Sequence, residues 1–134
     1  MPLSSPPYPT REMFEEEALA ALASIPEFLR ERLANVVLKV EEFATPEQLQ
    51  SVNIATRWGL SGLYEGRPLS KESVWESGDL PPVISLFRQP LLREWIDTGV
   101  GLKELIRHVV IHEAGHHFGF SDDDMHQLER MAED

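Results

Sequence analysis

The segment from Leu102 to Phe118, LKELIRHVVIHEAGHHF, carries apolar residues on almost every side of the helix that it favours. Such a helix is usually buried in the middle of a domain. Gly119 predicts its end, because glycine readily adopts the left-handed conformation of a C′ residue. Ser121 then predicts the N-cap of a final helix, with Asp124 at N3. We therefore expect residues 102–118 to form the central helix of the fold.

Upstream of this helix, the patterns predict short helices and strands. Thr10 can cap a helix in which Met13 stands at N3, and Pro26 suits the first turn of a second short helix. The expected strands are residues 35–43, 60–66 and 83–88. Residues 45–57 are ambiguous, with TPEQL able to open a helix, residues 66–82 predict a long loop, and residues 91–96 predict a short helical stretch before Gly99. These elements indicate an α+β fold, with a small mixed or antiparallel sheet packed on helices.

Length and composition set the organisation that we expect. A chain of 134 residues with 42% hydrophobic residues fits one domain, residues 10–134. The prolines of residues 1–9 predict a flexible arm. No stretch is long and apolar enough to span a membrane, and the N-terminus lacks the features of a secretory signal. Because the chain has no cysteine, nothing argues for an oxidising compartment, and we expect a cytoplasmic protein.

The charge balance argues against nucleic acid as a partner. The net charge is −11, and the basic residues are scattered rather than clustered. A surface that follows a phosphate backbone needs clustered lysine and arginine.

His112, Glu113 and His116 form the pattern H-E-x-x-H. Residues i and i+4 of a helix are neighbours one turn apart, so both imidazoles can reach one ion. Neutral histidine nitrogens suit zinc, and we expect one Zn²⁺ ion. Glu113 lies about 100° around the helix from His112, where its carboxylate can act on a water as a general base.

Catalytic zinc usually has three protein ligands, so a third is needed. Gly119 allows a sharp turn, and Asp122 follows His116 by six residues, giving H-E-x-x-H-x-x-G-x-x-D. In metzincins a histidine stands at that last position, and an aspartate oxygen can replace it. Other acidic or histidine side chains nearby are the fallback ligands: Asp123, Asp124, His126 and Glu129. The same aspartates also suit the positive end of a helix dipole.

The other histidines are not expected to share this ion. His108 and His116 are about 12 Å apart along the helix axis, so His108 is interpreted as a packed or hydrogen-bonded core residue. His117 lies about 100° around the helix from His116 and is expected to face solvent or the sheet. His126 is expected at the surface.

The segments HEAGHHFGFSDDDM, PPVISLFRQPLL and LSGLYEGRPL resemble the minimal zincin-like metallopeptidase family of bacterial proteins. The resemblance extends from about Phe28 to the end of the chain. It implies a pared-down zincin fold, zinc ligands His112, His116 and Asp122, and Glu113 as the general base. It also implies that strand 83–88 is the sheet edge beside the cleft, where Val83, Ile84, Ser85 and Leu86 would bind substrate through their backbone. An ordinary core role for this strand is the alternative.

These observations lead to three hypotheses for function. The first is a zinc-dependent peptidase that acts on a peptide or an unfolded protein segment. The second is a metal-stabilised module that binds peptide or protein without turnover, in a homo- or hetero-oligomer, because no downstream segment forms the far wall of a cleft. The third is a metal-dependent ribonuclease, against which the acidity argues. No oxyanion stabiliser is evident, although Tyr64, Arg88 and His126 are candidates.

Overall fold

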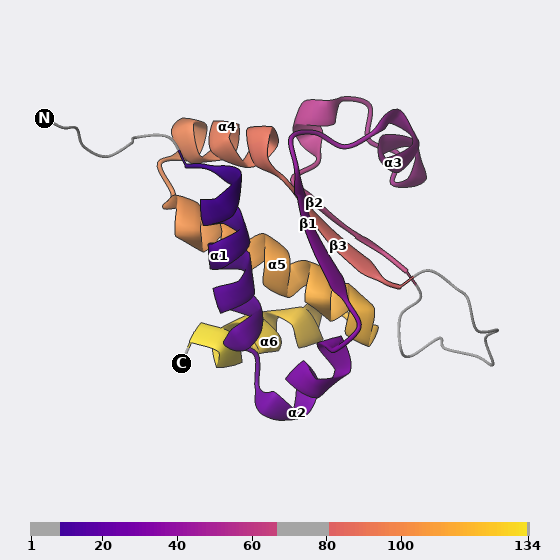
Figure 1. Ribbon diagram of the computed structural model, residues 1–134, viewed down its shortest axis with the longest axis vertical. Helices are drawn as coiled ribbons and strands as arrows, with labels where there is room; N and C mark the ends of the chain where they lie inside the picture. Colours follow the sequence, from indigo (N-terminus) through magenta and orange to yellow (C-terminus); the bar gives the residue numbers. More distant parts are fainter. Residues whose placement is uncertain (1–8, 67–80, 134) are drawn as a thin grey trace, which may run out of the picture.

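The computed structural model describes residues 9–66 and 81–133 (Figure 1). Residues 1–8 of the expected arm and residues 67–80 of the expected loop lie outside this description. In chain order, the elements are α1 (Arg11–Ala23), α2 (Glu27–Arg30), the 3-10 turn η1 (Glu31–Leu33), β1 (Val37–Glu41), α3 (Pro46–Ser51), the 3-10 turn η2 (Arg57–Gly59), β2 (Gly62–Glu65), β3 (Val83–Phe87), α4 (Arg88–Thr98), α5 (Leu102–Phe118) and α6 (Asp122–Glu133). None of the described helices is long and apolar enough to cross a membrane.

The described strands form a mixed sheet with β3 in the middle. β1 runs parallel to β3, with Val37 opposite Val83. β2 runs antiparallel to β3, with Gly62 opposite Leu86. The predicted α+β class, with a small sheet packed on helices, is therefore confirmed.

The expectation that residues 83–88 form an edge of the sheet is wrong. β3 is paired on both sides, so its backbone groups are used by β1 and β2. An extended peptide adds to a strand only where one side is unpaired. The expected substrate contacts through the backbone of Val83, Ile84, Ser85 and Leu86 therefore have no free edge to use. The side chains explain the central position, because Ile84 and Leu86 are fully buried on the side of the main core, and a strand buried on both faces is apolar in most positions.

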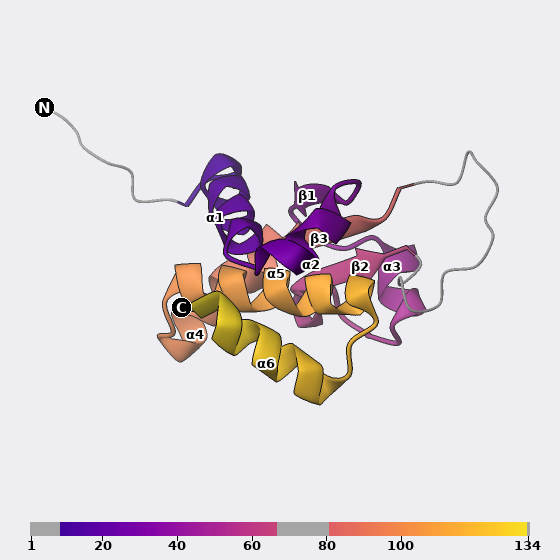
Figure 2. The same ribbon diagram turned by 90° about the horizontal axis from the view of Figure 1, so that it is seen from below.

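Helix α5 lies across one face of the sheet, with α1 and α6 on either side of it (Figures 1 and 2). Its buried side chains include Ile106, Val110 and Ile111, each at most 1% exposed. Burying one such side chain contributes about 1.5–3 kcal/mol. The exposed ion pair between Lys103 of α5 and Glu17 of α1, at 3.7 Å, belongs to a class that contributes about 1 kcal/mol or less. Apolar packing therefore holds α5 in the centre of the fold.

Helix α4 is longer than the sequence predicts. It begins at Arg88, directly after β3, and includes Pro90 in its first turn. Proline is tolerated there because the first amides of a helix have no partner within the helix. The helix ends at Gly99, whose φ of 74° is left-handed. The helix therefore begins three residues before the expected residue 91 and includes Pro90.

Arg88 joins three separate parts of the chain. Its Nε and Nη2 donate to the carbonyl of Pro9 at 3.1 and 2.9 Å, and its Nη1 donates to Glu42 Oε1 at 2.9 Å. Pro9, the one residue of the expected arm that is described, is buried and held by this contact. Arg88 thus connects the start of α1 to the end of β1, and its guanidinium is not available as an oxyanion stabiliser.

Strand β2 and helix α5 approach each other closely at Gly62. A Cβ atom at this position would overlap Val109 Cγ1 and would lie 3.7 Å from Glu113 Cγ. The constraint is space rather than backbone conformation, because Gly62 does not have a positive φ. Glycine therefore allows β2 to lie directly over the side of α5 that carries Glu113.

We predict that Gly62→Ala lowers the free energy of unfolding by about 1–3 kcal/mol, because the added methyl group overpacks this contact. Val109→Ala removes the opposing atom, so the double variant should lose less than the sum of the single losses. Gln127→Ala, at an exposed position of α6, serves as the control and should change stability by at most about 0.5 kcal/mol. Urea unfolding measures the wild type and the four variants, and strictly additive losses would contradict the contact.

Candidate metal centre

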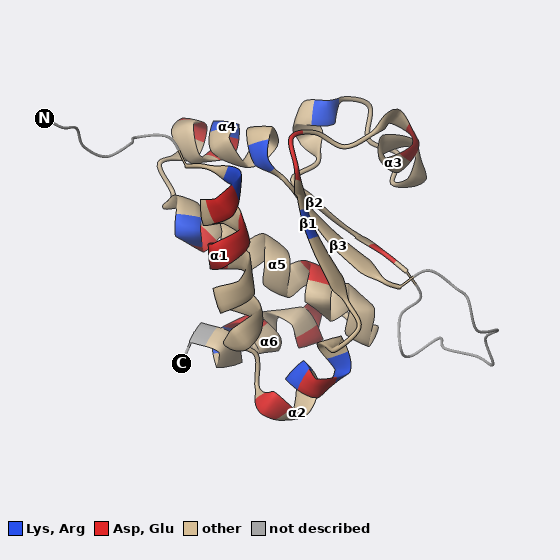
Figure 3. Ribbon diagram, viewed as in Figure 1, with Lys and Arg blue, Asp and Glu red and all other residues tan. Residues whose placement is uncertain are grey.

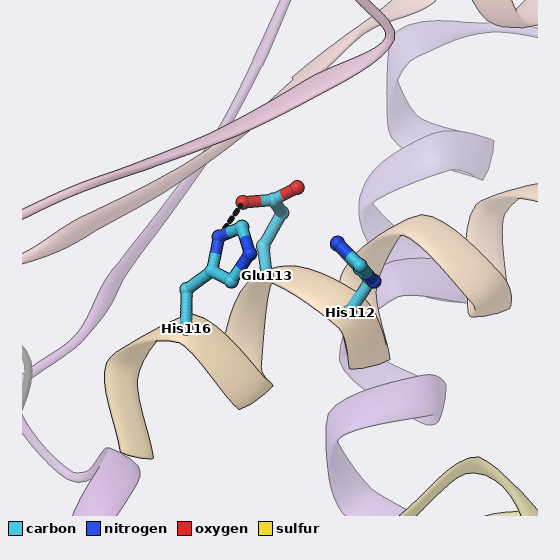
Figure 4. A group of neighbouring side chains, drawn as sticks. All are labelled: His112, Glu113 and His116. Carbon is cyan, nitrogen blue, oxygen red and sulfur yellow. Dashed lines mark ion pairs between the residues drawn. The ribbon is translucent and has the colours of Figure 1, made fainter. Parts of the chain in front are cut away.

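His112 and His116 project from the same side of α5, one turn apart (Figure 4). Their ring centroids are 4.8 Å apart. His112 is half-buried, whereas the His116 side chain is 45% exposed. The two imidazoles therefore lie at a place that solvent reaches, although many other residues of α5 are buried.

Glu113 lies beneath the sheet, next to both histidines. Its side chain is only 10% exposed, and its Oε1 is 3.1 Å from His116 Nδ1 (Figure 4). One ligand atom from each of His112, Glu113 and His116 lies within 4.8 Å of the other two. A buried carboxylate is retained at such a place only when it has a polar or charged partner, and here the partner is His116.

The expected turn after α5 is present. Gly119 has φ 77° and ψ 26°, and the amide of Phe120 donates to the carbonyl of Gly115 at 3.0 Å. This pattern is the Schellman motif, in which a left-handed residue satisfies the last helical carbonyls. The turn brings the chain back so that α6 packs against α5, where Met125 Cγ would lie 2.8 Å from a Cβ atom placed on Gly115.

Asp122 is the first residue of α6 and is exposed. It does not belong to the group formed by His112, Glu113 and His116 in the described part of the chain. Its charge nevertheless acts on His116, since it is one of the causes that raise the pKa of that imidazole. Asp122 thus lies close enough to His116 for its charge to act on that imidazole, but it is not part of the group that could hold an ion.

The neighbouring aspartates have different roles. Asp124 Oδ2 accepts from the amide of Ser121 at 3.3 Å, and the amide of Asp124 donates to Ser121 Oγ at 3.2 Å. This reciprocal pair is a capping box, as the sequence predicted. Asp124 is therefore committed to the start of α6, and Asp123, next to it, is exposed.

The structure places the remaining histidines at three different kinds of position. His108 is not a core residue: its side chain is 60% exposed, and its Nδ1 lies 2.7 Å from Glu129 Oε1. Of the two positions expected for His117, the one toward the sheet is confirmed, because this side chain is 2% exposed and bonds to Tyr64 of β2. His126 is exposed on α6, as expected.

The donor set fits zinc. Two imidazoles one helical turn apart, with a carboxylate beside them, supply the nitrogen and oxygen ligands that zinc takes in catalytic sites. The chain has no cysteine, so a thiolate site is excluded. A centre with two histidines and one carboxylate as ligands would leave the fourth coordination position open, which is what a hydrolytic metal centre requires.

A small mixed sheet thus lies over a buried helix that carries H-E-x-x-H, and the family comparison agrees with this arrangement. The model of the zincin-like metallopeptidase family matches residues 33–132. The chain therefore belongs to the zincin-like metallopeptidase family. A search of curated proteins gives no match.

The sequence analysis did not identify the sheet edge next to Glu113. This edge is β2, whose Gly62 lies over Glu113, whereas β3 is the middle strand. The apolar composition of VISLF is a signal for a central strand, and the polar residues of β1 and β2 are a signal for edges.

The pKa of His116 is raised, first because its imidazolium is hydrogen-bonded to Glu113, while burial acts in the opposite direction and the charges of Glu113 and Asp122 add to the rise. A raised pKa means that this pair stabilises the fold at pH values below about 6.5, and that the contribution is lost as the pH rises through the pKa of His116 in the folded protein.

We predict that Glu113→Gln lowers the pKa of His116 in metal-free protein, which an NMR titration of the imidazole resonances measures. An unchanged pKa would show that the bond to Glu113 is not its cause.

Proposed function

We propose that this protein is a zinc-dependent peptidase in which Glu113 is the general base. The observation that carries the proposal is the grouping of His112, Glu113 and His116 on one side of α5, within 4.8 Å of one another. Membership of the zincin-like metallopeptidase family supports it.

In this proposal His112, His116 and Asp122 hold the ion. A ligand atom of His112 lies within 4.8 Å of one of His116, whereas Asp122 would join them only after a shift at the start of α6. Asp122 is exposed and is the first residue of α6. When bound, a zinc ion supplies Lewis acidity toward a carbonyl oxygen and toward water.

Glu113 moves the proton. Its carboxylate, held beneath β2 and largely shielded from solvent, takes a proton from the attacking water and delivers it to the leaving amine. Glu113 Oε1 lies 3.1 Å from His116 Nδ1, so a cation held by His116 would compete with this ion pair and would leave the carboxylate available to a water.

The substrate in this proposal is an extended peptide or an unfolded protein segment that lies along β2. Among the described residues, β2 has a strand partner on one side only. An unpaired edge offers backbone groups to an added strand. Because Gly62 lies over Glu113, a peptide on this edge would have its backbone beside the catalytic carboxylate.

The two other hypotheses differ in what they require. A binding module needs the metal and the β2 edge but does not need Glu113 as a base. A ribonuclease needs a basic surface, whereas the described lysines and arginines are spread over separate elements such as β1, α2 and α4 (Figure 3). The net charge of −11 also opposes RNA binding.

We predict that Glu113→Gln lowers peptide hydrolysis by at least about 100-fold, because general base catalysis contributes on that scale. Zinc content and the unfolding midpoint should stay close to those of the wild type. Glu104→Gln removes the same charge from an exposed position of α5 and should leave the rate unchanged. Hydrolysis of a fluorescence-quenched peptide measures the rates, and equal rates for the wild type and Glu113→Gln would exclude the proposed mechanism.

We also predict that Asp122→Ala weakens zinc binding by about tenfold or more, because a third ligand is lost. Asp123→Ala is the matched control, since it removes the same charge from the next residue of the same helix turn. Competition of each protein with a chelating dye measures the dissociation constants. Equal weakening by the two variants would assign the effect to helix charge instead of ligation.

A further inference from the structure

A buried histidine next to the metal centre has no part in the chemistry described so far. His117 is 2% exposed and follows the ligand His116 directly. Its Nδ1 lies 2.8 Å from the hydroxyl of Tyr64, and its Nε2 lies 3.0 Å from the carbonyl of Arg32. A buried imidazole bonded at both nitrogens is held in one orientation.

The two partners determine where the protons are. A carbonyl oxygen can only accept, so His117 Nε2 carries the proton and donates it to Arg32. His117 Nδ1 is then the acceptor, and the Tyr64 hydroxyl donates to it. The hydroxyl proton of Tyr64 is thus directed at His117, and burial raises the pKa of Tyr64, which keeps this donor protonated.

Tyr64 stands on the substrate edge of the proposed enzyme. It is two residues from Gly62 in β2, so both residues face α5. At Gly62 the strand touches Val109 of α5, and at Tyr64 it is bonded to the last turn of the same helix. A steric contact at one end of the strand and a hydrogen bond at the other set its distance from α5.

We propose that Tyr64 and His117 are substrate-positioning residues, whose hydrogen bond sets the place of the β2 edge relative to the helix that carries Glu113. This inference rests on the proposed function and deepens it, since it assigns the pair to substrate placement and not to zinc binding or proton transfer. Without the bond, β2 loses the hydrogen bond between its Tyr64 and the last turn of α5, and we expect its free edge to shift relative to the catalytic carboxylate.

Three variants distinguish the effect of the hydrogen bond between Tyr64 and His117 from that of the hydrogen bond between His117 and the carbonyl of Arg32. Tyr64→Phe removes the donor to Nδ1 and keeps the ring. His117→Gln retains a donor for the Arg32 carbonyl and loses the acceptor for Tyr64. His117→Asn retains an acceptor near the position of Nδ1 and loses the donor to Arg32. If the Tyr64 bond positions β2, His117→Asn should resemble the wild type and the other two should resemble each other.

Hydrogen exchange of the backbone amides tests the positioning without any substrate. We expect Tyr64→Phe to increase exchange about tenfold in the β2 amides that bond to β3, while the amides of β1 keep their wild-type rates. Glu42→Gln, which weakens the bond to Arg88 at the end of β1, is the control for a general loss of stability. Unchanged exchange in β2, or the same increase in β1, overturns the proposal.

Kinetics with fluorescein-labelled β-casein, an unfolded protein, test the consequence for substrate. We expect Tyr64→Phe and His117→Gln to raise KM about tenfold, with kcat within twofold of the wild type and zinc content unchanged, and Glu42→Gln to leave KM unchanged. An unaltered KM, or a loss confined to kcat, overturns the proposal.

If Glu113→Gln leaves hydrolysis intact, the proposed function fails by itself, and the dissociation constant of casein measured by anisotropy replaces KM. If the wild type neither binds nor cleaves casein, hydrogen exchange decides alone.

Discussion

The burial of α5 is the constraint on which the rest of the structure depends. The helix is apolar on the sides that meet the sheet, α1 and α6, and these contacts determine its rotation about its own axis. Once that rotation is set, the side with His112 and His116 is the one left near solvent, and Glu113 points beneath β2. The metal-binding group is therefore a consequence of how the apolar residues of one helix are packed, and a change in that packing would turn both imidazoles together.

The sheet contributes its edge. β3 takes the middle position because its side chains can be buried on both faces, which leaves β1 and β2 outside. Of these two, β2 lies against α5, and a glycine at its start allows the approach. A strand placed over a helical carboxylate combines a backbone that can hold a peptide with a group that can move a proton. The edge of β2 and the side of α5 that carries Glu113 both belong to elements that also form the core. A short chain can therefore hold this arrangement.

Local features of the fold could be predicted from the sequence, and features that depend on distant contacts could not. The caps at Thr10 and Ser121, the left-handed residue Gly119 and the extent of α5 follow from residues close together in the chain. Strand order does not, because it depends on which faces are covered after folding. The family resemblance implied that residues 83–88 form the edge, whereas β3 is the middle strand.

The candidate site divides in the same way. The helical spacing of His112, Glu113 and His116 could be read directly, whereas the bond from Tyr64 to His117 joins residues that are 53 positions apart. His108 shows the same limit: its expected core position was wrong, because α6 places Glu129 beside it at the surface.

The measurement that tests the central claim most directly is the location of zinc in crystals of the protein by anomalous diffraction at the zinc edge. The account predicts one strong peak between the imidazoles of His112 and His116, with Glu113 beside it and outside direct coordination. A peak elsewhere, for example between His108 and Glu129, or no peak in crystals grown with excess zinc, would contradict the claim that one side of α5 forms the metal centre.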